Sequence, residues 1–127
     1  MSTLTLIELY TDADGRARFR DCPLALAEGS PAARLSALRA SGGWQFRHSP
    51  AGFASDFHCT TAPQWLVVLQ GRMEIGLQDG SARVFGPGEC FYSNDTLPAG
   101  ARFDPQVHGH RSRLVSGESL VTLFVRA

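Results

Sequence analysis

The sequence predicts an all-β protein, built as a sandwich or barrel of short strands. Its 13 Gly and 7 Pro fall between short runs rich in Val, Leu, Phe and Thr, the pattern expected of such folds. The segment 72–86 predicts a hairpin, because Met73, Ile75 and Leu77 alternate with polar residues, Asp79-Gly80 supplies a type I′ turn, and the return strand runs to Phe85. The segment 119–125, SLVTLFV, is apolar on both faces and predicts a strand that is covered on both sides.

The remaining elements follow in chain order. Residues 4–10 predict a strand, residues 11–15 a turn, and residues 16–21 the return strand. In residues 30–43, Ser30 could cap a short helix, Pro31 suits its first turn, and Gly42 and Gly43 would end it. Strand character resumes at residues 44–48, and a further strand starts at 89–93 after the punctuation of residues 86–88.

Length and charge bound the function. At 127 residues the chain has room for one domain with a hydrophobic core, so residues 1–127 are taken as a single domain. Twelve basic and twelve acidic residues cancel, which argues against a nucleic-acid or membrane partner and favours a small-molecule ligand. With no apolar run of about 20 residues and no signal-like start, we expect a cytoplasmic protein. Three widely spaced cysteines indicate reduced thiols rather than disulfides.

The most informative stretch runs from Gly52 to Gly71. His58 follows Gly52 after five residues, Thr60 lies two beyond it, Gln64 four further on, and Gly71 seven beyond that. Residues two apart on a strand share a face, so His58 and Thr60 can both face a barrel interior that Gln64 reaches from the next strand. This spacing resembles the first cupin motif, although Thr60 and Gln64 replace its second histidine and its glutamate.

A second region strengthens the resemblance. FGPGEC, NDT and GHRSRLV before the final apolar strand are similar to small single-domain cupins of unassigned function, with His110 or His108 arriving after an apparent insertion where the second motif has its histidine. The resemblance covers roughly residues 42–127. It implies a double-stranded β-helix, or jelly-roll barrel, over about 42–127, with N-terminal strands and an irregular or short-helical segment in 1–41. It also implies a homodimer.

The candidate metal ligands are His58, His110, His108 and Gln64. Neutral imidazole suits Zn, Fe, Mn or Ni, and three histidines would leave open positions for water or substrate. Each residue also has a simpler interpretation. His58 and His110 could be pocket histidines bonded to a neighbour, and His108 could be an exposed loop residue. Gln64 could be a hydrogen-bonding amide of the pocket or could hold a metal-bound water. The expected pocket wall is completed by residues on the same strands and the neighbouring loops: Thr60, Leu66, Val68, Tyr92 and Phe103.

Two functions stay open. In one, the barrel binds a divalent transition metal and a small organic molecule, and could be a metal-dependent enzyme whose reaction type, whether oxygenase, isomerase or lyase, the sequence does not distinguish. In the other, the altered ligand set marks a metal-free pocket for a small molecule. No organic cofactor is expected in either.

Overall fold

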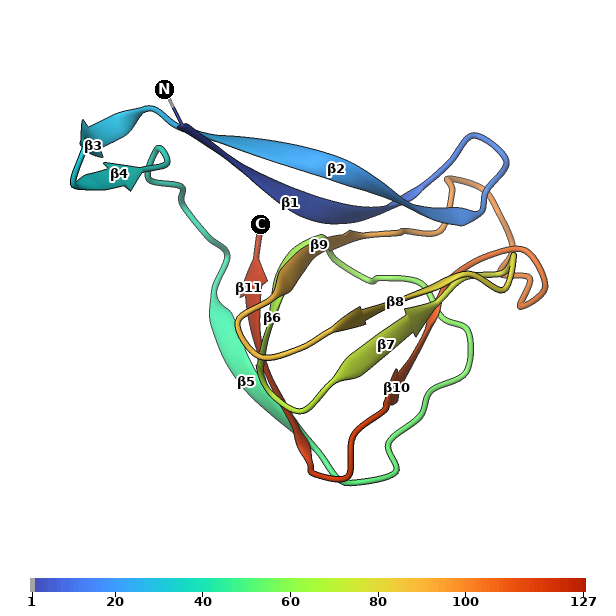
Figure 1. Cartoon of the computed structure of the whole chain (residues 1–127). Coiled ribbons are helices and arrows are strands. Elements are labelled where there is room, and N and C mark those ends of the chain that lie inside the picture. Colours follow the sequence, from blue (N-terminus) through green and yellow to red (C-terminus); the bar gives the residue numbers. More distant parts are fainter. Residues whose placement is uncertain (1) are drawn as a thin grey trace.

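The computed structural model describes residues 2–127, and within them the chain is all-β, with no helix (Figure 1). The predicted all-β class is therefore confirmed. The strands, in chain order, are β1 (Ser2–Thr11), β2 (Ala17–Leu26), β3 (Glu28–Ser30), β4 (Ala33–Leu35), β5 (Trp44–Ser49), β6 (Gln64–Gln70), β7 (Met73–Gly76), β8 (Ala82–Phe85), β9 (Cys90–Asn94), β10 (Arg111–Leu114) and β11 (Leu120–Arg126).

Two sheets face each other across the core. The larger has the strand order β2-β1-β9-β6-β11-β5, and the smaller has the order β10-β7-β8. Neighbouring strands are antiparallel except for β1 and β9, which run parallel. The two sheets close into an open-ended barrel, and the long β1–β2 hairpin lies across one end of it (Figure 1).

The N-terminal hairpin matches its prediction. β1 and β2 pair along their whole length, from Ser2↔Leu26 to Thr11↔Ala17. Gly15 adopts a φ of 81° in the connecting turn, where its amide donates to the Asp12 carbonyl at 2.9 Å. A left-handed conformation of this kind favours glycine, which explains why the predicted turn ends at this residue.

The turn between β7 and β8 differs from the expected two-residue type. A type I′ turn would need a positive φ at Asp79, and within residues 2–127 positive φ values occur only at glycines. Gly80 has a φ of 87° and donates to the Leu77 carbonyl, while the Leu77 amide donates to the Ser81 carbonyl. These bonds describe a longer loop that ends on a left-handed glycine. The alternation of buried Met73 and Ile75 with half-buried Glu74 is as predicted.

The short helix considered for residues 30–43 is wrong, and the irregular alternative is right. Ser30 ends β3, and Pro31 and Ala32 form the turn into β4. From there to the glycines the chain has no regular structure, and Leu38 is 99% exposed. Capping residues cannot hold so short a helix when it buries no apolar face, since most helical stability in proteins comes from packing.

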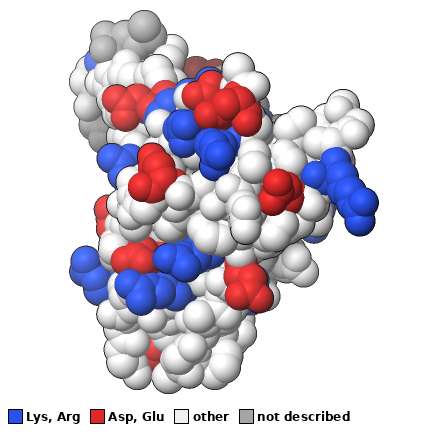
Figure 2. Space-filling view, turned by 90° about the vertical axis from the view of Figure 1, so that its right-hand side faces the viewer, with Lys and Arg blue, Asp and Glu red and all other residues white. Residues whose placement is uncertain are grey.

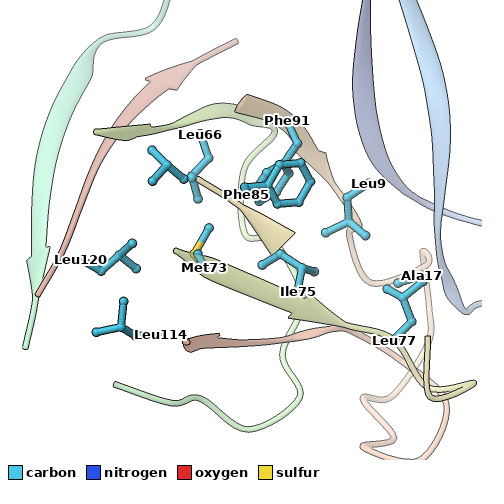
Figure 3. Packing of buried hydrophobic residues seen from close by; sticks show 11 residues of the cluster. Leu9, Ala17, Leu66, Met73, Ile75, Leu77, Phe85, Phe91, Leu114 and Leu120 are labelled. Carbon is cyan, nitrogen blue, oxygen red and sulfur yellow. The ribbon is translucent and has the colours of Figure 1, made fainter. Parts of the chain in front are cut away.

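The hydrophobic core fills the space between the two sheets (Figure 3). Phe91 from β9 packs its ring against Phe85 from β8, with centroids 4.6 Å apart. Met73 and Ile75 face them from β7, and Leu9 closes the end under the N-terminal hairpin. The hairpin therefore contributes to the core rather than hanging free.

Charges of both signs are interspersed on the face in Figure 2, with no broad area of one sign. Ion pairs of the fold include Arg113 with Glu74 (2.8 Å) and Arg18 with Asp14 (3.0 Å). Residues 2–127 contain no helix that is both long and apolar enough to span a membrane.

Candidate functional site

A cavity of about 260 Å³ opens between the two sheets at the end where the first-motif residues lie. Exposed Arg47 and His58 stand at its mouth, and buried His110 lies deeper. Its polar wall carries several hydroxyls and one amide, and its apolar wall belongs to the core. The lining residues are Arg47, Ser49, Phe53, His58, Cys59, Thr60, Thr61, Gln64, Leu66, Met73, Ile75, Phe91, Ser93, His110, Ser112, Leu120, Thr122 and Phe124.

His58 and His110 are brought together by their backbones. They form an isolated antiparallel bridge in which each amide donates to the other's carbonyl, at 2.9 and 3.0 Å. Opposed residues of this kind place their side chains side by side, and the two ring centroids are 4.8 Å apart. The fold thus pairs two histidines, His58 and His110, that lie 52 positions apart in the chain.

The His110 ring is held from behind. Its Nδ1 lies 2.8 Å from Oδ2 of Asp95, which is completely buried, while His110 itself is 4% exposed. The other oxygen of Asp95, Oδ1, accepts a hydrogen bond of 2.7 Å from the Thr11 hydroxyl. A buried carboxylate is stabilised only when its oxygens find donors, and here both do.

His58 is held differently, from the loop before it. Its Nδ1 lies 2.9 Å from the backbone carbonyl of Asp56, and the Ser55 hydroxyl is 3.4 Å from the same nitrogen. A carbonyl only accepts, so this contact requires a hydrogen on Nδ1. Partial burial lowers the pKa of His58, and the nearby positive charge of Arg47 acts in the same direction, so the neutral ring is favoured.

Thr60 and Gln64 both reach the cavity wall. The Thr60 hydroxyl lies 2.7 Å from that of Ser93, and its amide donates to the Asp95 carbonyl at 2.7 Å. Gln64 begins β6, and its side-chain Oε1 is buried with no hydrogen-bond partner in residues 2–127. Such an atom normally has a donor, so this one is available to a bound group.

Four predicted site residues lie elsewhere. His108 accepts a 2.9 Å hydrogen bond at Nδ1 from the Asp104 amide, and its ring lies near Phe103, which is 39% exposed. Both belong to the loop before β10, and neither lines the cavity. Tyr92 faces outward from β9 and packs its ring against Trp65. Val68, fully buried, belongs to the core and does not line the cavity.

Sequence reasoning missed Asp95 and Arg47 as site residues. Asp95 directly follows β9, and a polar residue at the end of a strand that enters a barrel is a usable signal. On β5, Arg47 lies one position after Phe46 and three after Trp44, so it points to the opposite face of the strand from these two exposed aromatic residues. Its guanidinium carbon lies 5.1 Å from the centre of the Phe53 ring, which keeps it at the cavity mouth.

Cys59 also lines the cavity, although strict alternation would turn it away from His58. The chain has no regular strand here beyond the single bridge at His58, so the alternation does not apply. Burial raises the pKa of the Cys59 thiol, and the Asp95 charge acts in the same direction. A thiol with a raised pKa is a poor nucleophile at neutral pH.

The residues present fit a transition metal only in part. Each histidine has its Nδ1 beside an oxygen acceptor, as metal-binding histidines usually do, because that contact orients the ring. The Nε2 atom of each ring is then left for a ligand. Metal sites with an open position ordinarily use three protein ligands. Residues 2–127 contain no group of three His, Cys, Asp or Glu side chains placed to hold a metal, and His108 is turned away. The donor set therefore falls short of the one that the resemblance implies.

Among known proteins, this chain is similar to solved structures. No family model and no curated protein matches the sequence. Similar solved structures include a Cupin 2 conserved barrel domain protein from Salinispora arenicola (17% identity, TM-score 0.46, covering 92% of this chain and 78% of that one). The cupin domain of Cnp3 from Schizosaccharomyces pombe has 10% identity and a TM-score of 0.47, with 98% of this chain and 84% of that one covered. A putative ethanolamine utilization protein Q from Salmonella typhimurium has 12% identity and a TM-score of 0.42, with 99% of this chain and 97% of that one covered.

Such similarities concern the course of the chain and say nothing about a ligand or a reaction. The two facing sheets form a barrel with the cavity between them, and the spacing of Gly52, His58 and Gly71 resembles that of the first cupin motif.

Proposed function

We propose that this barrel binds a small organic acid in the His58–His110 cavity without a metal. The observation that carries the proposal is that Arg47 is the one lining residue with a permanent charge, and it stands beside the histidine pair. A cavity with a single fixed positive charge favours a ligand of opposite charge, and a guanidinium can bind a carboxylate through two parallel hydrogen bonds.

The depth of the cavity supports an organic rather than an inorganic anion. Behind the histidines the wall is apolar, formed by Leu66, Ile75 and Phe91. Ligand pockets usually combine such walls with a few polar groups that fix orientation. The carboxylate would lie at the mouth near Arg47, and the hydrocarbon part would extend inward past His110.

A binding experiment tests this function. Benzoate, succinate and acetate are titrated by calorimetry in the presence of a chelator, and we expect at least one to bind. Arg47→Gln should weaken that binding about tenfold or more, because a hydrogen bond to a charged group contributes about 1.5–3 kcal/mol. Arg83→Gln is the matched control, since Arg83 also lies over a phenylalanine ring, that of Phe19, but outside the cavity.

A metal-dependent binding site or enzyme is the second candidate, favoured by the free Oε1 of Gln64. His58 and His110 would be its strong ligands and Gln64 a weak third. Metal analysis of protein purified without chelator, before and after incubation with Zn, Mn or Fe, separates the two candidates. Stoichiometric metal that is lost in His58→Ala would replace the first proposal with the second.

The homodimer that the resemblance implies is also proposed. Its support is the exposed pair Trp44 and Phe46 on β5, an edge strand of the larger sheet, since large exposed aromatic side chains commonly lie at interfaces. Light scattering on the purified protein gives the mass directly. A monomer at all concentrations would remove this proposal and leave the cavity unaffected.

A further inference from the structure

We infer that Asp95 and Thr11 are positioning residues that hold the His110 ring with an Nδ1–H on Asp95 and its Nε2 toward the cavity. The N-terminal hairpin thereby becomes part of the site. Its consequence for ligand affinity rests on the proposed function, whereas the form of the ring does not.

The first step is the chemistry of the Asp95–His110 contact. An ionised carboxylate has only acceptors, so the 2.8 Å contact from Oδ2 to Nδ1 requires the imidazole to donate. A neutral imidazole carries one hydrogen, and if that hydrogen is on Nδ1, Nε2 is an acceptor. His110 would then receive a hydrogen bond from a bound molecule rather than give one.

The second step is the burial of the pair. Asp95 is 0% exposed and His110 is 4% exposed, so water does not compete for the contact. Hydrogen bonds are stronger in such surroundings, and a neutral ring with its hydrogen on Nε2 would leave Oδ2 without a donor. The backbone bonds to His58 fix where the His110 ring is attached, and the contact with Asp95 fixes how the ring is turned.

The third step is the role of Thr11. Its hydroxyl lies 2.7 Å from Asp95 Oδ1 and 2.9 Å from the Thr96 carbonyl, and it reaches them from the end of β1. β1 pairs in parallel with β9 from Glu8↔Tyr92 to Tyr10↔Asn94, and this register places Thr11 beside Asp95. The hydroxyl supplies a donor to the carboxylate oxygen that His110 does not use, which fixes the orientation of the Asp95 carboxylate.

No other part of the site fixes His110 in this way. His58 is oriented by a backbone carbonyl in its own loop, the Asp56 carbonyl at 2.9 Å, and needs no residue from the N-terminal hairpin. The two rings of the pair are therefore set by independent devices. A change at Thr11 or Asp95 should affect His110 and leave the form of His58 as it was.

Nitrogen-15 NMR of the histidine rings in the ligand-free protein at pH 8.5 tests the inference. We expect His110 to show a hydrogen on Nδ1. An Nδ1 without a hydrogen would overturn the inference, since Asp95 would then have to donate to the ring. Because no ligand is present, this result is independent of whether the proposed acid binds.

Variants then assign the cause. Asp95→Ala should abolish the preference for Nδ1–H at His110, and Thr11→Val should weaken it, while Thr11→Ser should restore the wild-type spectrum because it keeps the hydroxyl. Wild-type His110 signals in a folded Asp95→Ala or Thr11→Val protein would overturn the assigned role of that residue. If Asp95→Ala does not fold, the wild-type spectrum and the Thr11 pair still decide. The same variants should leave the His58 signals unchanged.

Discussion

The main chains of His58 and His110 are hydrogen-bonded to each other in both directions, at 2.9 and 3.0 Å. This bridge, together with the Ala54↔Arg113 bridge, joins the first-motif segment to the segment of β10, and it leaves the two ring centroids 4.8 Å apart. The close approach depends on Gly109. A side chain there would meet the His58 carbonyl oxygen at 2.6 Å, so only glycine allows the bridge to form as it does.

Gly109→Ala should therefore destabilise the protein more than a typical glycine substitution. Both the left-handed φ of 86° and the contact with His58 oppose a Cβ atom, and we expect a loss of about 3 kcal/mol or more. Gly88→Ala is the control, because Gly88 has the same φ but no atom within 4 Å of the added carbon. It should cost about 1 kcal/mol. Equal losses in urea denaturation of the two variants would contradict the role of the bridge.

Stability should fall in mildly acidic solution in a way that depends on His58. Burial lowers the folded-state pKa of His58 below the ordinary value of about 6.5, so the unfolded chain takes up this proton first as the pH falls. The contribution of His58 is thus present above about pH 6.5 and is lost as the pH falls toward its lowered pKa. Thermal melting of wild type and His58→Asn from pH 8 to pH 5 measures this. The wild type should lose more stability than the variant, and parallel curves would argue against a buried neutral ring.

Leu66 and Val68 lie on the same face of β6, yet they should respond differently to truncation. Leu66 lines the cavity, whereas Val68 is enclosed by the core. Val68→Ala should cost roughly 2 kcal/mol of stability and leave benzoate affinity unchanged. Leu66→Ala should cost stability and also change affinity, because it alters the wall. Calorimetry on both variants checks this, and a loss of affinity in Val68→Ala would place the cavity deeper than described.

The strands could be predicted because local pattern and tertiary structure agree in them. The alternation around Met73 and Ile75 and the turn at Gly15 each carry their signal within a few residues. The helix considered at Ser30 failed for the opposite reason. Its capping residues gave a local signal, but whether Leu38 would be buried depends on the rest of the molecule.

The site was predictable only as far as the motif spacing reached. That spacing put His58, Thr60 and Gln64 beside one cavity. It could not choose between His108 and His110, because the choice depends on how the loop after β9 folds back. Asp95 could not be predicted for a related reason. Its partners His110 and Thr11 are 15 and 84 positions away, and the parallel pairing of β1 with β9 brings Thr11 to it.

His108 provides the last prediction, since the structure removes it from the site. Its ring supports the loop by accepting the Asp104 amide at 2.9 Å, and its carbonyl accepts from the Gln78 side chain at 3.1 Å. His108→Ala removes only the first of these bonds, which lies on the exposed side of the loop and should be worth about 1 kcal/mol. We expect unchanged metal content and unchanged affinity for benzoate, with a small decrease in melting temperature.

His110→Ala is the matched comparison for that experiment, because it removes the other histidine of the same i, i+2 pair. It should leave the buried Asp95 carboxylate without the ring that donates to it, a loss of about 1–3 kcal/mol or more of stability. If His108→Ala instead reduced metal content or ligand affinity as much as His110→Ala does, the loop before β10 would have to fold back over the cavity in solution. Measuring both variants by calorimetry and metal analysis under the same conditions decides which histidine completes the site.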